Sequence, residues 1–243
     1  NYGLVGKEKI IKLGILSLMA GENLILIGPP GTAKSEISRR FNKIFEKESY
    51  FEYLLTKFTT PEEIFGPFSI KKLQEDKFER STEGYIPRSK IVFLDEIFKA
   101  NSSILNTLLT IINEKVFHNG IKIEKIPLIS LIGASNEVPL DNEELTALYD
   151  RFLVRGIVDY ISDEEIEMLL DIENNEIEIP EELKFTLDEL EEIRKNSKEI
   201  KVSNGIKKTI IEIRREYNKV FMDDKNEIIS DRKIVKIMKL LKI

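Results

Sequence analysis

The segment 23–35, NLILIGPPGTAKS, constrains the fold of this chain more than any other segment. It starts as a short apolar strand, continues as a loop of glycine and proline, and ends with a lysine and a serine that open a helix. Gly28, Lys34 and Ser35 have the spacing of a phosphate-binding loop, which requires a strand before it and a helix after it. The segment therefore predicts an α/β fold with a polyphosphate site at one strand end.

The residues of this loop have distinct chemical roles in the expected site. Backbone N–H groups from Gly31 to Ser35 can surround a polyphosphate, with the positive end of the following helix facing it. The Lys34 ammonium adds a charge for the β- and γ-phosphates, and the Ser35 hydroxyl can ligate Mg²⁺. Ala33 stands where the template has glycine, so we expect a helical rather than a left-handed backbone there. The expected nucleotide-binding residues of the loop are Gly28, Pro30, Gly31, Thr32, Ala33, Lys34 and Ser35.

Composition removes several classes of function. The chain has no cysteine, which excludes disulfides, thiolate catalysis and cysteine-based zinc sites and is typical of proteins in the reducing cytoplasm. It has one histidine, His118. A formal net charge of −6 disfavours general affinity for nucleic acid. No apolar run approaches the roughly 20 residues of a membrane helix. The chain begins at Asn1 rather than at methionine, so we expect its natural N-terminus to lie upstream.

Apolar strands alternate with amphipathic helices over the first 160 residues. Besides 24–27, strands are expected at 50–55, 91–94 and 128–134 and near 155–160. Such alternation predicts a parallel sheet with helices on both faces, and ligands bind at the carboxyl ends of its strands. Gly28, Asp95 and Asn136 fall at or just after strand ends, so we expect them to meet in one crevice.

Two segments interrupt this alternation. Residues 66–87 are interpreted as an inserted hairpin with strands at 68–73 and 77–80. In a second hairpin, Asn119-Gly120 predicts a two-residue turn between strands 116–118 and 121–123. His118 near that turn is expected to be exposed rather than catalytic. The helix before it should bury Ile104, Leu105, Leu108, Leu109 and Ile112.

The pattern becomes helical from about Ser162. Capping boxes are expected at 162–165 and 186–189, and two later helices carry apolar residues on one face. The chain is therefore divided into an α/β nucleotide-binding domain at 1–160 and a small helical domain at 161–243.

Three polar residues at strand ends carry the expected chemistry. Asp95 follows four apolar residues, as does the Mg²⁺-side carboxylate of a P-loop nucleotidase, and Glu96 is a candidate base for the attacking water. Asn136 can contact the γ-phosphate and the water. Helix capping for the acidic pair and turn formation for the asparagine are the ordinary alternatives. The absence of an Asn-Lys-x-Asp motif favours ATP over GTP.

Two arginines are candidates for contacts with the phosphates. Arg151 lies far enough along the chain to reach the nucleotide of a neighbouring copy and to stabilise transition-state charge. Arg232 opens the last helix and can fold over the phosphates from the helical domain. A surface ion pair is the ordinary alternative for each of them.

Seven segments in order resemble the MoxR family of AAA+ ATPases, and its RavA (regulatory ATPase variant A) branch in particular. They are GPPGTAKS at 28–35, FTTPEEIFGP at 58–67, IVFLDEIFKA at 91–100, ILNTLLTIINEK at 104–115, GASNE at 133–137, ALYDRFLVR at 147–155 and SDRK at 230–233. The resemblance covers essentially the whole chain, and alanine at position 33 is typical of that family.

The resemblance implies a role for each candidate residue. It implies Walker A for Lys34 and Ser35, Walker B for Asp95 and Glu96, sensor 1 for Asn136, the arginine finger for Arg151 with Arg155 as the second candidate, and sensor 2 for Arg232. Val5 and Gly6 match the segment that touches adenine. The interruptions at 66–87 and around Asn119-Gly120 match the helix-2 insert and the pre-sensor-1 hairpin. The domain at 161–243 would be the helical lid.

Family members typically form hexameric rings and remodel proteins in a chaperone-like way, often with a partner that carries a von Willebrand factor A domain. The resemblance therefore implies ATP hydrolysis between adjacent subunits, with a further region after this chain. A small-molecule P-loop kinase, a non-hydrolysing scaffold and a DNA-acting ring motor are the alternatives. Lys115, Lys122 and Lys125 give the second hairpin some basic character, but the acidic whole disfavours the last of these.

Overall fold

The computed structural model describes residues 4–44, 50–139, 142–171, 179–222 and 227–243. The chain divides into two compact units, Asn1–Thr186 and Leu187–Ile243. The sequence pattern placed the boundary at residue 160, whereas residues 161–186 group with the α/β unit. Two contacts connect this segment to the α/β unit: Phe185 N–H donates to the Ile44 carbonyl at 2.7 Å, and the Glu165 carboxylate lies against Gly6.

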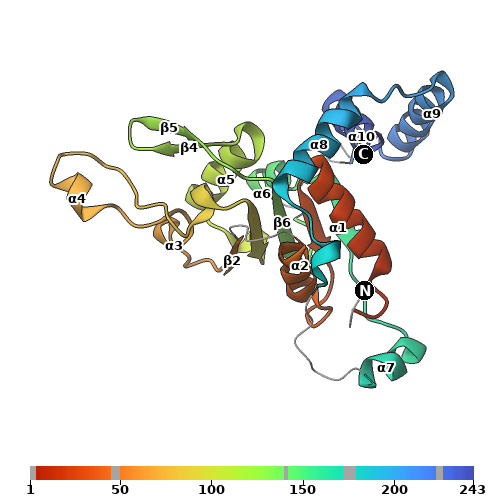
Figure 1. The fold of residues 1–243 in the computed structure, drawn as a ribbon, viewed down its shortest axis with the longest axis horizontal. Coiled ribbons are helices and arrows are strands. Elements are labelled where there is room, and N and C mark those ends of the chain that lie inside the picture. Colours follow the sequence, from red (N-terminus) through yellow and green to blue (C-terminus); the bar gives the residue numbers. More distant parts are fainter. Residues whose placement is uncertain (1–3, 45–49, 140–141, 172–178, 223–226) are drawn as a thin grey trace. The chain divides into compact units, whose positions relative to one another are not determined.

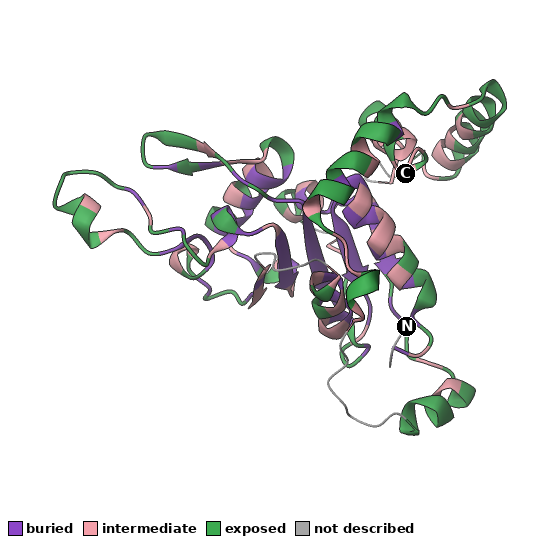
Figure 2. Cartoon of the chain, viewed as in Figure 1, coloured by how far each residue is buried: buried purple, intermediate pink, exposed green. Residues whose placement is uncertain are grey.

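A five-stranded parallel sheet forms the centre of the first unit, and its strand order is β2-β3-β6-β1-β7 (Figure 1). The strands are β1 (Leu24–Ile27), β2 (Tyr50–Leu54), β3 (Ile91–Asp95), β6 (Ser130–Ser135) and β7 (Val154–Ile157). Every residue of the central strands β1 and β6 is buried, as their near-continuous apolar sequences require (Figure 2). The α/β fold predicted from the sequence is confirmed.

Helices pack on both faces of this sheet because successive strand side chains point to opposite sides. Ile25 and Ile27 join one apolar core with helix α5 (Ser102–Glu114). Leu26 lies on the other face, together with Ile10 of helix α1 (Glu8–Ala20). Both side chains approach Gly156 of β7, and a Cβ built there would lie 3.1 Å from Ile10 Cδ1 and 3.2 Å from Leu26 Cδ2. Helix α2 (Lys34–Lys43) follows the loop at 28–33, and α6 (Glu143–Tyr149) precedes β7.

Helix α5 buries almost the stripe that its sequence pattern predicts. Ile104, Leu105, Leu108 and Ile112 are buried as expected. Ile111 is buried as well, whereas Leu109 is only half-buried and packs against the edge of the core.

The extension at 66–87 differs from the predicted pair of strands. It begins after helix α3 (Pro61–Phe65), which starts with a capping box made by Thr60 and Glu63. Only Phe68 and Arg80 form an antiparallel bridge, and residues 70–73 wind into the one-turn helix α4 (Ile70–Leu73). Ser69 explains the difference, because its hydroxyl accepts a hydrogen bond from Lys72 N–H at 3.4 Å and caps a helical turn. The short 3₁₀ helix η1 (Ile86–Arg88) ends the extension.

Strands β4 (Val116–Asn119) and β5 (Lys122–Lys125) form the second predicted hairpin with its turn shifted by one residue. Asn119 pairs with Lys122, so the turn is Gly120-Ile121 rather than Asn119-Gly120. The Asn119 amide instead joins the two insertions, accepting from Arg80 N–H at 2.6 Å and donating to the Arg80 carbonyl at 3.3 Å. Figure 1 shows both insertions extending from the same side of the sheet.

The remaining elements of the first unit are short. They are η2 (Ile97–Lys99), α7 (Asp163–Leu170) and η3 (Glu181–Leu183). Helix α7 begins at the predicted capping box, in which Ser162 and Glu165 each accept a backbone hydrogen bond. Among the described residues, no helix combines the length and the apolar character needed to cross a bilayer.

The second unit consists of helices, as predicted. They are α8 (Leu187–Glu199), α9 (Asn204–Val220) and α10 (Asp231–Leu240). Ser203 and Ser230 cap α9 and α10. Arg214 connects these two helices, because its Nε donates to the Ile229 carbonyl at 2.9 Å and its guanidinium pairs with Asp231 at 2.6 Å.

Candidate active site

The phosphate-loop segment lies at the carboxyl end of β1, between β6 and β7. Ile27 at the end of β1 is in register with Ser135 of β6, and Gly28 N–H donates to the Ser135 carbonyl at 3.1 Å. A Cβ on Gly28 would lie 2.0 Å from the Val158 carbonyl oxygen. Gly28 is therefore required by the close approach of the chain that follows β7.

Ala33 has a left-handed backbone, with φ of 66° and ψ of 24°, so the helical conformation expected there is wrong. This conformation costs an alanine about 1–2 kcal/mol. The loop reverses direction over Gly31, which also has a positive φ of 79°, and Ala33 completes the reversal directly before α2. Ala33 therefore has the left-handed backbone that a glycine would adopt at this position of the loop, although it carries a methyl side chain.

The Lys34 ammonium lies inside the curve of this loop. Its Nζ donates to the carbonyl oxygens of Gly28 at 2.7 Å and Pro29 at 2.8 Å, and to Oδ1 of Asn136 at 3.0 Å. Burial lowers the pKa of Lys34, and the nearby charges of Asp95 and Glu96 oppose that shift. The side chain is therefore positioned where a phosphate on the loop would meet it.

Ser35 and Asp95 form a pair of oxygen donors next to the loop. The Ser35 hydroxyl donates to Oδ2 of Asp95 at 3.1 Å, although 60 residues separate them in sequence. The Glu96 N–H donates to Oδ1 of Asp95 at 2.9 Å and holds this carboxylate in place. A hydroxyl and a carboxylate are hard oxygen ligands of the kind that Mg²⁺ prefers, so the pair fits the predicted metal position.

Glu96 is fixed from two sides at the end of β3. Nδ2 of Asn136 donates to Oε1 of Glu96 at 2.6 Å, and Lys99 Nζ lies 3.5 Å from Oε2. Asn136 therefore bridges Lys34 and Glu96, and its oxygen faces the cation while its amine faces the carboxylate. These contacts confirm the prediction that the loop after β1, Asp95 and Asn136 meet at one edge of the sheet, and Glu96 joins them there.

A sequence model for the MoxR domain of MoxR–vWA–beta-propeller ternary systems matches residues 1–195. The chain belongs to the MoxR family. The matched family is that of the ternary systems, and the match does not support the RavA branch that the motifs resembled.

Relatives of this MoxR chain are longer than the chain itself. It is 45% and 43% identical to two uncharacterized proteins of Methanocaldococcus jannaschii, and each match covers all of the chain but only 62% and 61% of the relative. It is 34% identical to structural protein ORF618 of Acidianus two-tailed virus, over 80% of the chain and 33% of that protein. The chain thus spans about three fifths of the length of the first two relatives.

A solved structure from Cytophaga hutchinsonii, described as that of a candidate ATPase, has the same fold. The TM-score is 0.75 at 19% sequence identity, with 98% of this MoxR chain and 74% of the other chain covered. At this identity the likeness concerns the fold alone. It agrees with the parallel sheet and the C-terminal helices seen here.

The two candidate finger arginines flank the start of β7, an edge strand of the sheet. Arg151 pairs with Asp150 at 3.7 Å, and its Nε is buried without a hydrogen-bond partner among the described residues. Arg155 lies over the Tyr149 ring at 3.8 Å and donates from Nε to the Phe152 carbonyl at 3.3 Å. Arg155 belongs to this edge strand, and Arg151 lies in the segment directly before it.

Arg232 lies in the second unit, near the start of α10. Its predicted contact with the phosphates stays a prediction, as does the contact of Val5 and Gly6 with a base.

Two further hydrogen bonds hold the phosphate loop. Thr32 donates from its hydroxyl to the Pro29 carbonyl at 2.9 Å, and the Tyr160 hydroxyl donates to the Pro30 carbonyl at 3.2 Å.

Sequence reasoning missed two residues that support this site. Lys99 pairs with Glu96 three positions before it, a spacing that the sequence alone could have indicated. Tyr160 gave no comparable signal, because only the path of the chain after β7 brings its hydroxyl to the loop.

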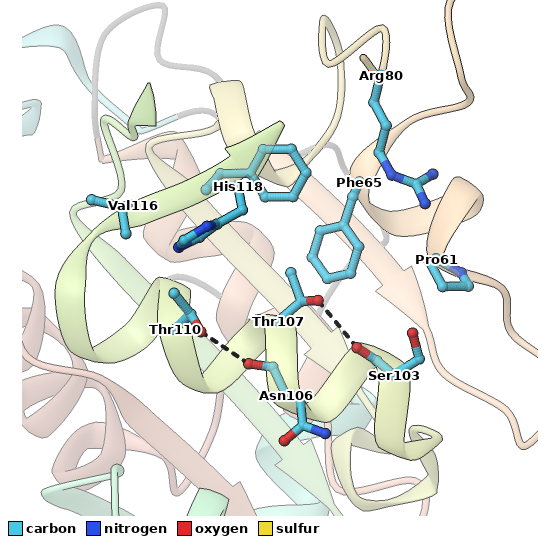
Figure 3. A pocket seen from close by; sticks show the side chains of 10 residues that line it. Pro61, Phe65, Arg80, Ser103, Asn106, Thr107, Thr110, Val116 and His118 are labelled. Carbon is cyan, nitrogen blue, oxygen red and sulfur yellow. Dashed lines mark hydrogen bonds between the residues drawn. The ribbon is translucent and has the colours of Figure 1, made fainter. Parts of the chain in front are cut away.

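A separate cavity of about 460 Å³ is lined by residues of α3, α5 and β4 together with Arg80. Figure 3 shows His118 and Phe65 facing a polar wall of α5 that is formed by Ser103, Asn106, Thr107 and Thr110. The hydroxyls of Thr107 and Thr110 donate to carbonyls one turn earlier in their own helix. His118 is exposed, as predicted. The lining contains no carboxylate and no lysine, so the candidate catalytic site is the one around Lys34.

Proposed function

We propose that this MoxR domain binds ATP with Mg²⁺ and hydrolyses it to ADP and phosphate. The observation that carries the proposal is the bridge made by Asn136, which joins the cation of the phosphate loop to a carboxylate at the next strand end. A loop that only bound phosphate would need Lys34 but no carboxylate in contact with the same amide.

In the proposed complex, Lys34 exchanges its loop carbonyl partners for oxygens of the β- and γ-phosphates. The backbone N–H groups of Gly31 to Ser35 surround the same phosphates. Ser35 and Asp95 would hold Mg²⁺, which would neutralise part of the phosphate charge. The 3.1 Å contact between these two side chains supports a shared ligand position.

Glu96 is the proposed general base. It orients a water for in-line attack on the γ-phosphorus and accepts the proton of that water as the bond to the β–γ bridging oxygen breaks. Asn136 keeps the carboxylate in place and contributes an amide dipole toward the γ-phosphate. The contacts of Glu96 with Asn136 at 2.6 Å and with Lys99 at 3.5 Å support a fixed position for this base.

An arginine from a neighbouring copy completes the proposed site. Arg151 is the first candidate and Arg155 the second, and their position at the edge strand supports a contact in trans. We propose a ring, hexameric by analogy with the family, in which Arg232 of the lid approaches the phosphates of its own chain.

The proposed role is chaperone-like remodelling or assembly of a protein, carried out in the cytoplasm. The matched systems combine a MoxR domain with a vWA domain, which supports a von Willebrand factor A domain protein as the partner. The chain covers only about three fifths of its longer relatives, so the remodelling activity is proposed for the whole protein rather than for this domain.

Phosphate release by the purified domain tests this proposal. We expect release from ATP with Mg²⁺ and none in excess chelator, without any acceptor molecule. Release that requires a small-molecule acceptor would instead indicate a kinase. Tight ATP binding without any release, over a range of protein concentrations that includes assembled rings, would indicate a non-hydrolysing scaffold.

A further inference from the structure

The order of the strands determines in which direction a bound nucleotide would run. On the proposed function, the γ-phosphate lies toward Asp95, the last residue of β3, and Asn136, which follows β6. In the sheet, β1 lies between β6 and β7. The base must therefore leave the loop on the opposite side, toward β7 and the residues that follow it.

The chain after β7 lies directly against this side of the loop. The Val158 carbonyl occupies the space that a Cβ on Gly28 would fill, and the Tyr160 hydroxyl donates to the Pro30 carbonyl at 3.2 Å. Lys7 donates from Nζ to the Asp159 carbonyl at 2.5 Å. The N-terminal segment and the segment after β7 thus flank the position of the base together.

Glu165 places a carboxylate in this position. An ideal Cβ on Gly6, whose φ is 67°, would lie 2.6 Å from Oε1 and 2.9 Å from Oε2 of Glu165. The Glu165 carboxylate therefore lies directly against the backbone of Gly6. Oε2 accepts a hydrogen bond from Ser162 N–H at 2.9 Å in the capping box of α7. Oε1 is the oxygen that remains for a ligand beside Gly6.

An ionised carboxylate oxygen accepts hydrogen bonds and cannot donate them. Adenine has an exocyclic amine that donates, whereas guanine has a carbonyl oxygen at the corresponding position. Two-point pairing with the N–H groups of guanine needs both carboxylate oxygens to face the base, whereas the bond from Ser162 N–H turns Oε2 toward the start of α7. Oε1 would therefore accept from the exocyclic amine of adenine and would face the carbonyl oxygen of a guanine bound in the same orientation.

We propose that Glu165 is a specificity residue, whose Oε1 accepts a hydrogen bond from the exocyclic amine of adenine. It deepens the proposed function, because it names the group that selects ATP over GTP at the same site. The sequence motifs alone favoured ATP only through the absence of a guanine-reading motif.

Glu165→Gln tests this inference without removing the helix cap, since glutamine also completes a capping box. Its single amide oxygen would stay with Ser162 N–H, so its amine would face the base. We expect ATP affinity to fall about tenfold or more, since a hydrogen bond to a charged group contributes about 1.5–3 kcal/mol. GTP affinity should stay equal or rise, because the amine can donate to the guanine oxygen.

Glu164→Gln is the matched control. It makes the same substitution one position earlier on α7, at an exposed side chain in the first turn. The affinities of both variants and of the unaltered domain are measured by displacing a fluorescent ATP analogue with ATP or with GTP. The control should keep the ATP-to-GTP affinity ratio of the unaltered domain, whereas Glu165→Gln should lower that ratio about tenfold or more.

Two results would overturn this inference and leave the proposed function intact. One is an unaltered domain that binds ATP and GTP equally well. The other is an unchanged ATP-to-GTP ratio in Glu165→Gln, which would assign Glu165 to the helix cap alone. If the unaltered domain bound neither nucleotide, the proposed function itself would fail.

Discussion

Asn136 donates a hydrogen bond of 2.6 Å from Nδ2 to Oε1 of Glu96. The orientation of this amide is determined by its other contact, because its Oδ1 accepts from a lysine ammonium at 3.0 Å. The strand ends of β3 and β6 are therefore connected through one side chain, and the loop after β1 is connected to both. A change in how Lys34 is bonded would reach Glu96 through this single amide.

Asn136→Ala should lower hydrolysis by at least about tenfold while ATP binding changes little. The variant removes the hydrogen bond that orients Glu96, and a hydrogen bond to a charged group contributes about 1.5–3 kcal/mol. Phosphate release and nucleotide affinity are measured on the same preparation. A large loss of affinity with unchanged turnover would assign Asn136 to binding instead.

Glu96→Gln should bind ATP and fail to hydrolyse it. The amide keeps the shape of the side chain but cannot accept the proton of the attacking water, and general base catalysis typically contributes about 10²–10⁴-fold. The trapped ATP state should favour the assembled ring, which size measurements with and without ATP would reveal. Turnover equal to that of the unaltered domain would place the catalytic base elsewhere.

Lys34→Ala should abolish nucleotide binding, because the loop loses its side-chain charge for the β- and γ-phosphates. The affinity for ATP is measured by titration, and circular dichroism shows whether the variant is folded. Lys99→Ala is a control for charge, since it removes a neighbouring lysine that contacts Glu96 but not the loop. Tight ATP binding by a folded Lys34→Ala variant would contradict the assignment.

Arg151→Ala should nearly silence hydrolysis and leave ATP binding largely intact, since an arginine finger contributes about 10³–10⁵ in rate. Mixing Arg151→Ala with Lys34→Ala subunits should restore part of the activity, because some interfaces then combine an intact loop with an intact finger. If mixing restores nothing and Arg155→Ala behaves as described here, then Arg155 is the finger. Isolated subunits that hydrolyse at the full rate would rule out a shared site.

Ala33→Val should lower the free energy of unfolding by about 1–2 kcal/mol, because a β-branched side chain is disfavoured at a positive φ. The φ of Ala33 is 66°. Ala33→Gly is the matched control, and its gain from relieved strain is offset by a more flexible unfolded chain, so its stability should stay within about 1 kcal/mol of the unaltered domain. Urea unfolding monitored by circular dichroism measures all three proteins.

Much of the site was predictable because its chemistry depends on local spacing. Lys34 and Ser35 follow an apolar strand at the spacing of a phosphate loop, and Asp95 ends another apolar strand. Parallel strands bring their carboxyl ends to one edge, so the convergence of these residues with Asn136 follows from the order of strands and helices. The capping boxes at α3 and α7 were likewise local patterns.

Backbone conformation and register were decided by tertiary contacts instead. The intrinsic preference of alanine predicted a helical residue at position 33, but the path of the loop into α2 imposes a left-handed one. Asparagine is a common turn residue, yet the side-chain amide of Asn119 binds the backbone of Arg80 in the other insertion. The turn therefore lies at Gly120-Ile121. In both cases a contact or a chain path outside the local window outweighed a local preference, which for Ala33 is about 1–2 kcal/mol.

The sequence by itself determined the α/β class, the phosphate loop and the acidic strand end, because periodicity and motif spacing are properties of neighbouring residues. Only the tertiary structure decided that Asn136 bridges Lys34 and Glu96, that Tyr160 supports the loop, and that Glu165 lies against Gly6. These pairs are separated by 40 to 159 positions in the sequence. Such contacts depend on how the strands and the following segments pack in space, and that packing has no local pattern from which it can be read.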